Sequence, residues 1–432
     1  MGIVAAILAP MLTASLLAAI AGLYYVASAT FKVWLSWRGL HAFKDADTPF
    51  VPEDLLPVYT ILAPMRGEAG VLPAFVASMR ALDYPVAKLD IKILLEADDA
   101  PTIAAARAHA AGCPFDIIVV PVAAPRTKPK ALNIGLQSAR GGLITVYDAE
   151  DAPEPLQLRE AAATFGREAQ DCACLQARLN FYNARENPLT RLFALEYALW
   201  FDVMQPGLAS RALPIPLGGT SNHFRTRALK EAGGWDPFNV TEDADLGLRL
   251  ARLGLKVGVL PSTTFEEACP TLSGWLRQRT RWMKGFMVTY LVHMRDPLRL
   301  WRELGGMGFF SVQLFLGGAV ACALINPVFW LLFAVSAAGE FPAIAAVFAP
   351  PVALISTMSL FAGNAALVFL SLLAPLRRGW WGLIPFAVLT PLYWMLISLA
   401  AYLALLELAS SASYWAKTEH GVSRVHPQAR RA

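Results

Sequence analysis

Charged residues are distributed very unevenly along this chain, and this distribution constrains its fold more than any other sequence feature. Residues 1–31 contain no Asp, Glu, Lys or Arg, residues 307–376 contain only Glu340, and residues 379–406 contain none. A membrane-spanning helix needs roughly 20 mostly apolar residues. The first and third blocks therefore each predict one span, and the second has room for two. With 56% hydrophobic and 16% charged residues, the chain is not a disordered protein, a disulfide miniprotein or a simple soluble enzyme.

The residues between these blocks have ordinary polarity, and their number fits one large α/β domain. We therefore predict four regions: an N-terminal anchor at 1–31, a soluble domain at 32–306, a membrane bundle at 307–409 and a basic tail at 410–432. A cleaved signal peptide is the alternative for the first region. That region lacks a basic segment before its apolar run, and the run exceeds a typical signal-peptide core, so the sequence favours an anchor.

The charges that follow the first span predict which side of the membrane holds the soluble domain. Lys32, Arg38 and Lys44 come directly after it, and basic residues stay on the cytoplasmic side. The sequence thus predicts an integral inner (plasma) membrane protein with a cytoplasmic domain. Its five cysteines, an odd number, argue against a disulfide framework. No basic stripe with interleaved aromatic residues is present, which argues against a nucleic-acid partner.

Strand-like and helix-like segments alternate in the first part of the soluble domain. The expected strands are 59–64, 89–95, 115–120 and 142–147, and the expected helices are 72–82, 102–110 and 131–138. Such alternation with short connections predicts an α/β fold with a doubly wound, mostly parallel sheet. Ligands of such sheets bind beyond the carboxyl ends of the strands.

Acidic clusters follow two of these strands, Glu96 to Asp99 after the second and Asp148 to Asp151 after the fourth. Asp148 and Glu150 are spaced to share a hard divalent cation, Mg²⁺ or Mn²⁺. Lys128 stands where a loop enters a helix, and both its charge and the helix N-terminus suit a phosphate group. Solvated loops are the plain alternative for each segment alone. Together they predict a nucleoside diphosphate site.

Two later motifs predict helices with chemistry on them. Thr241-Glu242-Asp243 is a helix-start signature, with Thr as the N-cap and acids in the first turn. Residues 272–290 form an amphipathic stretch in which Gln278, Arg281 and Trp282 share one face. An amide, a guanidinium and an aromatic plane suit a pyrophosphate and a sugar ring, although an interfacial helix with a Trp anchor has the same pattern. Residues 185–212 predict either an interfacial helix over the site or a core helix.

In their order along most of residues 55–295, these motifs resemble those of membrane-integrated family-2 glycosyltransferases of the GT-A fold, such as bacterial cellulose, hyaluronan and other β-glycan synthases. The resemblance implies inverting transfer of a sugar from a UDP-sugar to a growing β-linked polysaccharide, coupled to export across the membrane. It also implies Mg²⁺ or Mn²⁺ as cofactor. The implied partners are the UDP-sugar donor, a glycan acceptor, membrane lipids and accessory export proteins.

The resemblance also assigns a role to each residue that matches a family motif. Asp243 is the catalytic base. The nucleotide-sugar ligands are Glu68, Glu96 or Asp98, Lys128, Asp148 and Arg281, and Gly67 replaces the family's Asn before Glu68. The metal ligands are Asp148 and Glu150, with Asp151 as the alternative to Glu150. The acceptor ligands are Thr220, Glu242 and Trp282, Gln278 belongs to the Gln-x-x-Arg-Trp motif, and Lys417 and Thr418 belong to a lid segment.

Two alternatives to a polysaccharide synthase fit parts of the sequence. A non-processive enzyme that glycosylates a lipid such as ceramide or diacylglycerol would have the same motifs. A transporter or receptor with an α/β sensor domain would not need the acid pair, the base and the arginine–tryptophan helix together.

The number of C-terminal crossings is open at this stage. Three full crossings (about 309–335, 343–373 and 382–408) would place the C-terminus outside, whereas the basic tail and a lid require the cytoplasm. Either Pro385 and Pro391 break the last block into an interfacial or re-entrant piece plus a span, or residues 307–376 hold an additional short crossing. We predict a cytoplasmic C-terminus.

Overall fold

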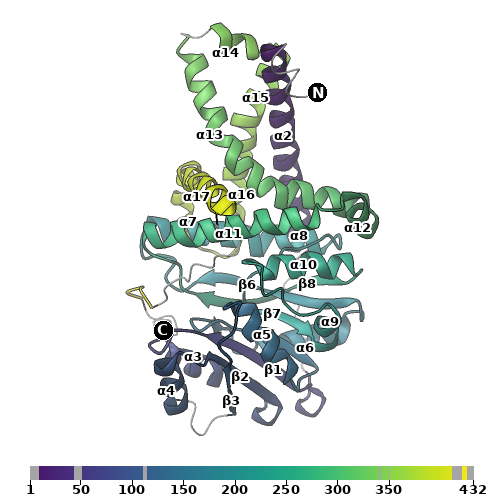
Figure 1. Cartoon of the computed structure of the whole chain (residues 1–432), viewed down its shortest axis with the longest axis vertical. Helices are drawn as coiled ribbons and strands as arrows, with labels where there is room; N and C mark the ends of the chain where they lie inside the picture. The colour runs from purple at the N-terminus through teal and green to yellow at the C-terminus, as the bar shows by residue number, and fades with distance from the viewer. Residues whose placement is uncertain are drawn as a thin grey trace.

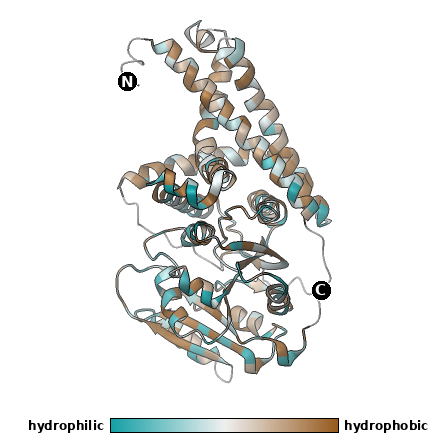
Figure 2. Ribbon diagram, turned by 90° about the vertical axis from the view of Figure 1, so that its right-hand side faces the viewer, coloured by the Kyte–Doolittle hydropathy of each residue, from teal (hydrophilic) through white to brown (hydrophobic). Residues whose placement is uncertain are grey.

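A computed structural model describes residues 9–42, 51–109, 114–339, 342–348, 350–410 and 421–425. The predicted lid residues Lys417 and Thr418 lie outside this part of the chain. An α/β domain occupies one end of the molecule, and a stalk of long helices rises from it (Figure 1). Hydrophobic residues dominate the stalk, while the α/β domain has mixed polarity (Figure 2).

The α/β domain is built on one eight-stranded sheet. Its strands are β1 (Tyr59–Met65), β2 (Leu89–Glu96), β3 (Phe115–Val120), β4 (Leu143–Val146), β5 (Ala152–Pro153), β6 (Cys172–Phe181), β7 (Asn222–Arg225) and β8 (Lys256–Glu266). Their order is β3-β2-β1-β4-β7-β6-β8-β5. The pairs β1–β2, β1–β4, β2–β3 and β6–β8 are parallel, and β4–β7, β6–β7 and β5–β8 are antiparallel. The sheet is therefore mixed but mostly parallel, as predicted.

Helices cover both faces of this sheet. They are α3 (Leu72–Arg80), α4 (Ala100–His109), α5 (Lys128–Gln137), α6 (Gln157–Arg167), α9 (Thr226–Glu231) and α10 (Glu242–Arg252). Helix α3 buries Leu72, Phe75, Val76 and Met79 against β1 and β2, which is the stripe that the helical spacing predicts. Burying one such side chain contributes about 1.5–3 kcal/mol. Helix α5 packs on the opposite face with Leu132 and Leu136.

A layer of helices separates the sheet from the stalk. It consists of α7 (Pro188–Leu199), the π-helical turn η3 (Trp200–Met204), α8 (Gln205–Ala209), α11 (Leu272–His293) and α12 (Pro297–Val312). Helix α7 begins with a capping box between Asn187 and Thr190, and the Thr271 hydroxyl caps α11. The predicted helical segment 185–212 is thus present, and it lies between the sheet and the apolar helices.

In the described part of the chain, four helical stretches are long and apolar enough to cross a membrane. They are α2 (Pro10–Ala42), α12–α13 (Pro297–Ser336), α15–α16 (Pro350–Arg377) and η6–α17 (Trp381–Ser410). Helix α2 is held on the layer below it by two glycines. A Cβ on Gly39 would lie 1.8 Å from the Val203 carbonyl oxygen, and one on Gly207 would lie 2.1 Å from that of Leu35. Larger residues at these two positions would push the helices apart.

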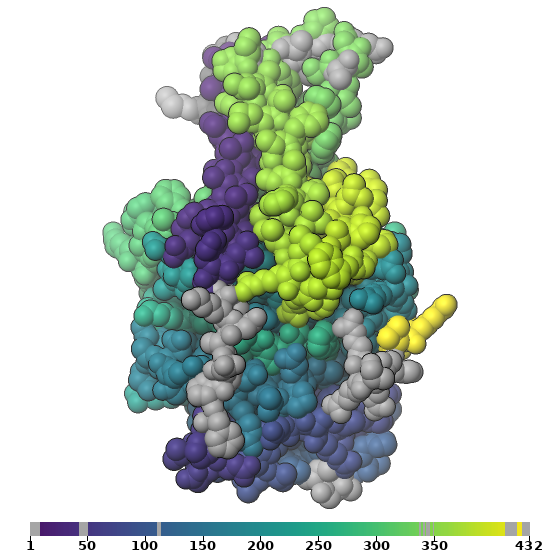
Figure 3. Space-filling model, turned by 180° about the vertical axis from the view of Figure 1, so that it is seen from behind, coloured from purple at the N-terminus to yellow at the C-terminus, as the bar shows by residue number. Residues whose placement is uncertain are grey.

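The arrangement of these stretches bears on the open question of topology. Helices α2, α13 (Gly318–Ala337) and α16 (Asn364–Arg377) run along the long axis, whereas α17 (Thr390–Ser410) lies at the base of the stalk, is seen nearly end-on, and packs against α11 (Figure 1). Seen from behind, α2 lies alongside α15 (Pro350–Thr357) and α16 (Figure 3). The 3₁₀ segment η6 (Trp381–Leu389), which contains Pro385, separates α16 from α17, and Pro391 lies in the first turn of α17.

The tail returns to the α/β domain. The backbone N–H groups of Gly421, Val422 and Ser423 donate to the Glu267 carboxylate at 2.6, 2.9 and 2.7 Å. The Ser423 hydroxyl donates to Glu186 at 2.7 Å. Burial would raise the pKa of Glu186, but hydrogen bonds from Ser423 and Asn183 hold it below its usual value. Residues 421–425 therefore lie on the same side of the bundle as the α/β domain.

Candidate active site

A cavity of about 510 Å³ lies between the carboxyl ends of the strands, the α7 and α11 layer and the base of the stalk. Most of the predicted site residues line it: Glu68, Glu96, Lys128, Asp148, Glu150, Thr220, Glu242, Asp243, Gln278, Arg281 and Trp282. Asp98 and Asp151 do not line it. The sheet explains this convergence, because β1, β2 and β4 are parallel neighbours and end at one edge.

Lys128 and Asp148 form the centre of this edge. The Lys128 ammonium lies 2.6 and 2.8 Å from the two Asp148 carboxylate oxygens and donates to the Gly219 carbonyl at 2.8 Å. Burial opposes the lysine's charge, but Asp148 and Glu242 outweigh it and raise the pKa of Lys128. The lysine is therefore a fixed positive charge at the start of α5, where it can meet a phosphate.

Asp151 acts within the loop rather than in the cavity. Its carboxylate accepts the backbone N–H of Asp148 at 2.7 Å and contacts the Thr220 hydroxyl. That hydroxyl also donates to the Val146 carbonyl at 3.0 Å. Burial, together with the charge of Asp148, raises the pKa of Asp151 well above its usual value. This geometry favours Glu150, which lines the cavity, over Asp151 as a second metal ligand, and it ties Thr220 to the loop.

The sequence leaves Glu96 and Asp98 as candidates for the acid that contacts the nucleobase, and the structure separates them. Glu96 lines the cavity and pairs with Lys130 at 3.2 Å. Asp98 lies outside the lining and pairs with Arg126, which lowers the pKa of Asp98. Of the two acids, Glu96 is the one positioned to contact a ligand.

Glu242 and Asp243 occupy the first turn of α10. Thr241 is the N-cap residue of α10, as predicted, but its side chain makes no capping bond and instead lies beside Asn239 and Thr289. Burial raises the pKa of Asp243, against the opposing effects of Lys128 and Arg281. Burial and the neighbouring Asp243 charge raise the pKa of Glu242 to about 7.

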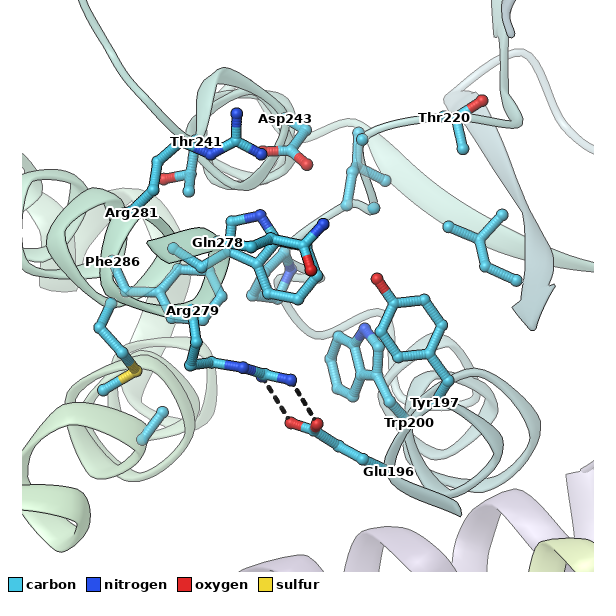
Figure 4. A pocket seen from close by; sticks show the side chains of 18 of the residues that line it. Glu196, Tyr197, Trp200, Thr220, Thr241, Asp243, Gln278, Arg279, Arg281 and Phe286 are labelled. Atoms are coloured by element: carbon cyan, nitrogen blue, oxygen red, sulfur yellow. Dashed lines mark hydrogen bonds and ion pairs between the residues drawn. The ribbon is translucent and has the colours of Figure 1, made fainter. Parts of the chain in front are cut away.

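Helix α11 presents its predicted motif to the cavity, with Gln278 pointing inward and Arg281 close to Asp243 (Figure 4). Burial lowers the pKa of Arg281, although Glu242, Asp148 and Asp243 oppose this. The Gln278 amide oxygen is buried and has no hydrogen-bond partner within the described residues. Trp282 stacks near Tyr197, with ring centroids 6.3 Å apart. A buried acceptor and an aromatic face are therefore available to a ligand.

Sequence reasoning missed Glu266, the last residue of β8. It lines the cavity, and its Oε1 atom is buried without a hydrogen-bond partner within the described residues. Burial and the nearby charges of Asp151 and Glu150 raise the pKa of Glu266 well above its usual value. The signal was available, because Glu266 is a third acid at the end of an apolar strand.

Sequence reasoning also missed an ion pair beside Trp282, in which Arg279 is buried and Glu196 is partly exposed. The Arg279 guanidinium donates to both Glu196 oxygens at 2.8 and 2.6 Å (Figure 4). The Tyr393 hydroxyl also donates to Glu196, at 2.6 Å. Arg279 also lies 4.8 Å from the Trp282 ring centroid. This cluster joins α11, α7 and α17 behind the site.

The carboxylates around the cavity exceed the cations that face them. Asp148, Glu150, Asp151, Glu242, Asp243 and Glu266 lie near Lys128 and Arg281. No group of three or more His, Cys, Asp or Glu side chains within the described residues is gathered as a metal site. Mg²⁺ and Mn²⁺ need only one or two carboxylates when substrate phosphates supply the remaining ligands. Asp148 and Glu150, which both line the cavity, fit that kind of site.

Comparison with known proteins shows which family the chain resembles. The family model described as "Glycosyltransferase like family 2" matches residues 57–285. The chain is 26% identical over 251 residues to a probable glycosyltransferase of Bacillus subtilis, YdaM, covering 57% of this chain and 60% of that protein. It is 28% identical over 245 residues to a beta-monoglucosyldiacylglycerol synthase of Trichormus variabilis, covering 55% and 50%.

Two further comparisons concern a plant enzyme and a solved structure. A glucomannan 4-beta-mannosyltransferase of Oryza sativa is 26% identical over 261 residues, covering 55% of this chain and 47% of that one. The matches thus span roughly half to three fifths of these relatives' lengths. The structure of the mannosyltransferase PcManGT from Pyrobaculum calidifontis, in complex with GDP-Man and Mn²⁺, aligns with a TM-score of 0.57 at 20% identity, covering 91% of this chain and 99% of that one. This likeness supports the predicted fold class.

Proposed function

Because this chain belongs to glycosyltransferase family 2, we propose that it transfers a sugar from a nucleoside diphosphate sugar to a hydroxyl group that reaches the site from the membrane side. The sequence favours a UDP-sugar as donor. One observation carries the proposal: Lys128 with Asp148, and Arg281 with Asp243, line a single cavity that continues between the apolar helices. A nucleotide-sugar site and an acceptor path are thus joined.

The proposed mechanism is a single inverting displacement. Asp243 removes the acceptor's hydroxyl proton as general base. The oxygen bonds to the anomeric carbon as the bond from that carbon to the diphosphate breaks, so the diphosphate leaves with the electron pair. Lys128 and Arg281 stabilise the negative charge that grows on it. Bound Mg²⁺ or Mn²⁺, held by Asp148 and Glu150, would supply further neutralisation of this charge.

The acceptor has two candidates, and the cavity favours one of them. The sequence predicts a growing β-linked polysaccharide that is exported through the spans, with accessory export proteins. Among the described residues, however, the cavity lining reaches only Tyr25 in α2 and Asn326 in α13, near the middle of both helices. A path that stops at this depth suits the lipid-glycosylation alternative, since a polymer needs a passage to the far side.

The proposed location is the inner (plasma) membrane with the α/β domain in the cytoplasm. The four apolar stretches and the Lys and Arg residues that follow α2 support this orientation. The position of residues 421–425 beside Glu267 supports a C-terminus on the same side.

The donor is tested on the full-length protein in detergent. Nucleotide release is measured with a panel of radiolabelled UDP- and GDP-sugars, in Mg²⁺, in Mn²⁺ and in EDTA. We expect release from a UDP-sugar with a metal present. If only GDP-sugars gave metal-dependent release, the donor would carry guanine and not the predicted uracil. No release from any donor would refute the proposed function.

Nucleotide binding should depend on metal through Asp148. A ligand at a hundred times its Kd stabilises the folded state by about 2.7 kcal/mol, so UDP should raise the thermal unfolding midpoint when Mn²⁺ or Mg²⁺ is present. We expect Asp148→Asn to remove this rise, because the variant loses a carboxylate of the metal site. The exposed Asp54, outside the cavity, supplies the matched control Asp54→Asn. An equal UDP-induced rise in Asp148→Asn would exclude the assigned role.

Glu242 should shape the pH dependence of transfer. Lowering the pH through about 7 protonates Glu242, which removes a negative charge beside Asp243 and weakens that base. We therefore expect kcat/KM to fall below about pH 7, and we expect Glu242→Gln to lack this step. The measurement is kcat/KM from pH 5 to 9. A step near pH 7 that persists in Glu242→Gln would contradict this assignment.

A further inference from the structure

The cavity continues beyond the proposed catalytic groups into the base of the stalk. We call this part the inner cavity. It is lined by Tyr25 and Lys32 of α2, Cys322 and Asn326 of α13, Leu367 of α16 and Ile397 of α17. One of its polar groups is satisfied between the helices, because the Tyr25 hydroxyl donates to the Asn364 side chain at 2.6 Å. To a ligand, the inner cavity therefore offers a mostly apolar surface at membrane depth.

Lys32 is the exception in this surface. The cavity's other cations lie next to acids, as Lys128 does with Asp148 and Arg279 with Glu196. Within the described residues, Lys32 has no carboxylate at ion-pair distance, and the inner cavity contains no acid. An ammonium among apolar helices is unfavourable unless it reaches water or meets an anion. Lys32 is only partly exposed and lines the cavity, so an anionic ligand would satisfy it.

Aromatic side chains form another part of the cavity lining. Trp200 stacks on Phe315 with ring centroids 4.6 Å apart, and Tyr197 stacks near Trp282. All four line the cavity. The cavity thus combines an apolar zone, the Lys32 ammonium without a carboxylate partner in the described part of the chain, aromatic faces and the carboxylate of Asp243. These groups suit, respectively, an acyl or isoprenoid chain, a phosphate, a sugar or polyol and a reacting hydroxyl.

We infer that the inner cavity binds the acceptor, and that this acceptor is a membrane lipid with a phosphate in its headgroup, which the Lys32 ammonium pairs with. The inference rests on the proposed function and names the acceptor class for that site. It differs from a neutral acceptor such as diacylglycerol, which would leave Lys32 without a counter-ion.

The test supplies the full-length protein in nanodiscs with a total bacterial membrane lipid extract and the donor that the nucleotide-release panel identifies. Labelled products are separated on an anion-exchange column. We expect the label in a lipid that the column retains because of its phosphate. Label in an unretained neutral lipid, or in a water-soluble polymer, would overturn the inference.

The role of Lys32 is tested with Lys32→Gln and a matched variant, Arg38→Gln. Arg38 is on the same helix, is exposed and does not line the cavity. A charge-assisted contact to phosphate predicts that Lys32→Gln raises the KM for the lipid about tenfold to a hundredfold, while Arg38→Gln leaves it unchanged. Equal KM values for Lys32→Gln and wild type would refute the phosphate contact.

Two further arms separate the sources of failure. Millimolar inorganic phosphate should neither replace the lipid as acceptor nor restore transfer in Lys32→Gln, since the apolar zone contributes to binding. If phosphate did either, the site would be one for free phosphate and not for a lipid. Hydrolysis of the donor by water and stabilisation by UDP do not require the acceptor. If both are normal while no phosphate-bearing lipid is labelled, the acceptor inference fails and the proposed function stands. If both are absent, the proposed function fails and the inference with it.

Discussion

Replacing Asp243 with Asn is expected to lower sugar transfer by about 10²- to 10⁴-fold, the range typical of a lost general base. Asn keeps the shape and a hydrogen-bond acceptor for the Ala244 N–H, which donates to Asp243 at 2.8 Å. It cannot take the proton of the acceptor hydroxyl. Because the diphosphate site is centred on Lys128 and Asp148, UDP binding should stay at the wild-type level.

The measurement compares kcat for transfer with UDP-induced thermal stabilisation in the same preparation. Removing the Asp243 charge also removes a cause of the raised pKa of Glu242, so the variant should fold at least as well as wild type. The matched control is again Asp54→Asn, which should transfer normally. Turnover near the wild-type rate in Asp243→Asn would mean that another group is the base. If the variant lost both the UDP-induced stabilisation and the transfer activity, a damaged fold would be indicated instead.

The first half of the α/β domain could be predicted because its signals are local. The predicted strand 115–120 coincides with β3, and 89–95 falls one residue short of β2. Alternation of apolar residues and short turns is visible within a window of the sequence. The antiparallel insertion of β7 between β4 and β6 has no such signal, because it pairs Leu143 with Arg225 and Cys174 with Phe224 across long stretches of chain.

The same distinction applies to the site. Glu96 and Asp148 line one cavity because parallel strands end at one edge, and that rule can be applied to a sequence. The partners of Arg279 could not be found in this way, since Glu196 is 83 residues away and Tyr393 is 114 residues away. Thr241 is the N-cap residue of α10, but its hydroxyl lies beside Asn239 and Thr289 and makes no capping bond. The contact with Thr289, 48 residues away, has no local signal in the sequence.

Arg279→Met is expected to destabilise the protein by about 3 kcal/mol. Removing one partner of a buried ion pair typically destabilises by 3–5 kcal/mol. The lower end of this range applies because the Glu196 side chain is 33% exposed and still accepts a hydrogen bond from the Tyr393 hydroxyl. Met fills much of the volume of the Arg stem, so the change isolates the charge and its hydrogen bonds. The matched variant Arg277→Met lies on the same helix at an exposed position and should change the free energy of unfolding little.

The Arg279 cluster should also control activity through Trp282. The guanidinium lies 4.8 Å from the Trp282 ring centroid and 5.1 Å from that of Phe193, so its loss frees an aromatic ring that faces the acceptor path. A disordered ring weakens acceptor binding and leaves the diphosphate site intact. The expected result is a higher KM for the acceptor at an unchanged KM for the donor.

Tyr393→Phe removes one hydroxyl and keeps the ion pair. One hydrogen bond to a charged group is worth about 1.5–3 kcal/mol, so the effects of this variant should have the same sign as those of Arg279→Met and a smaller size. A double-mutant cycle between Arg279→Met and Tyr393→Phe measures their coupling, because both side chains share Glu196. Additive changes would show that α17 and α11 act independently at this site. A donor KM that rises as much as the acceptor KM would contradict a role for the cluster in acceptor binding.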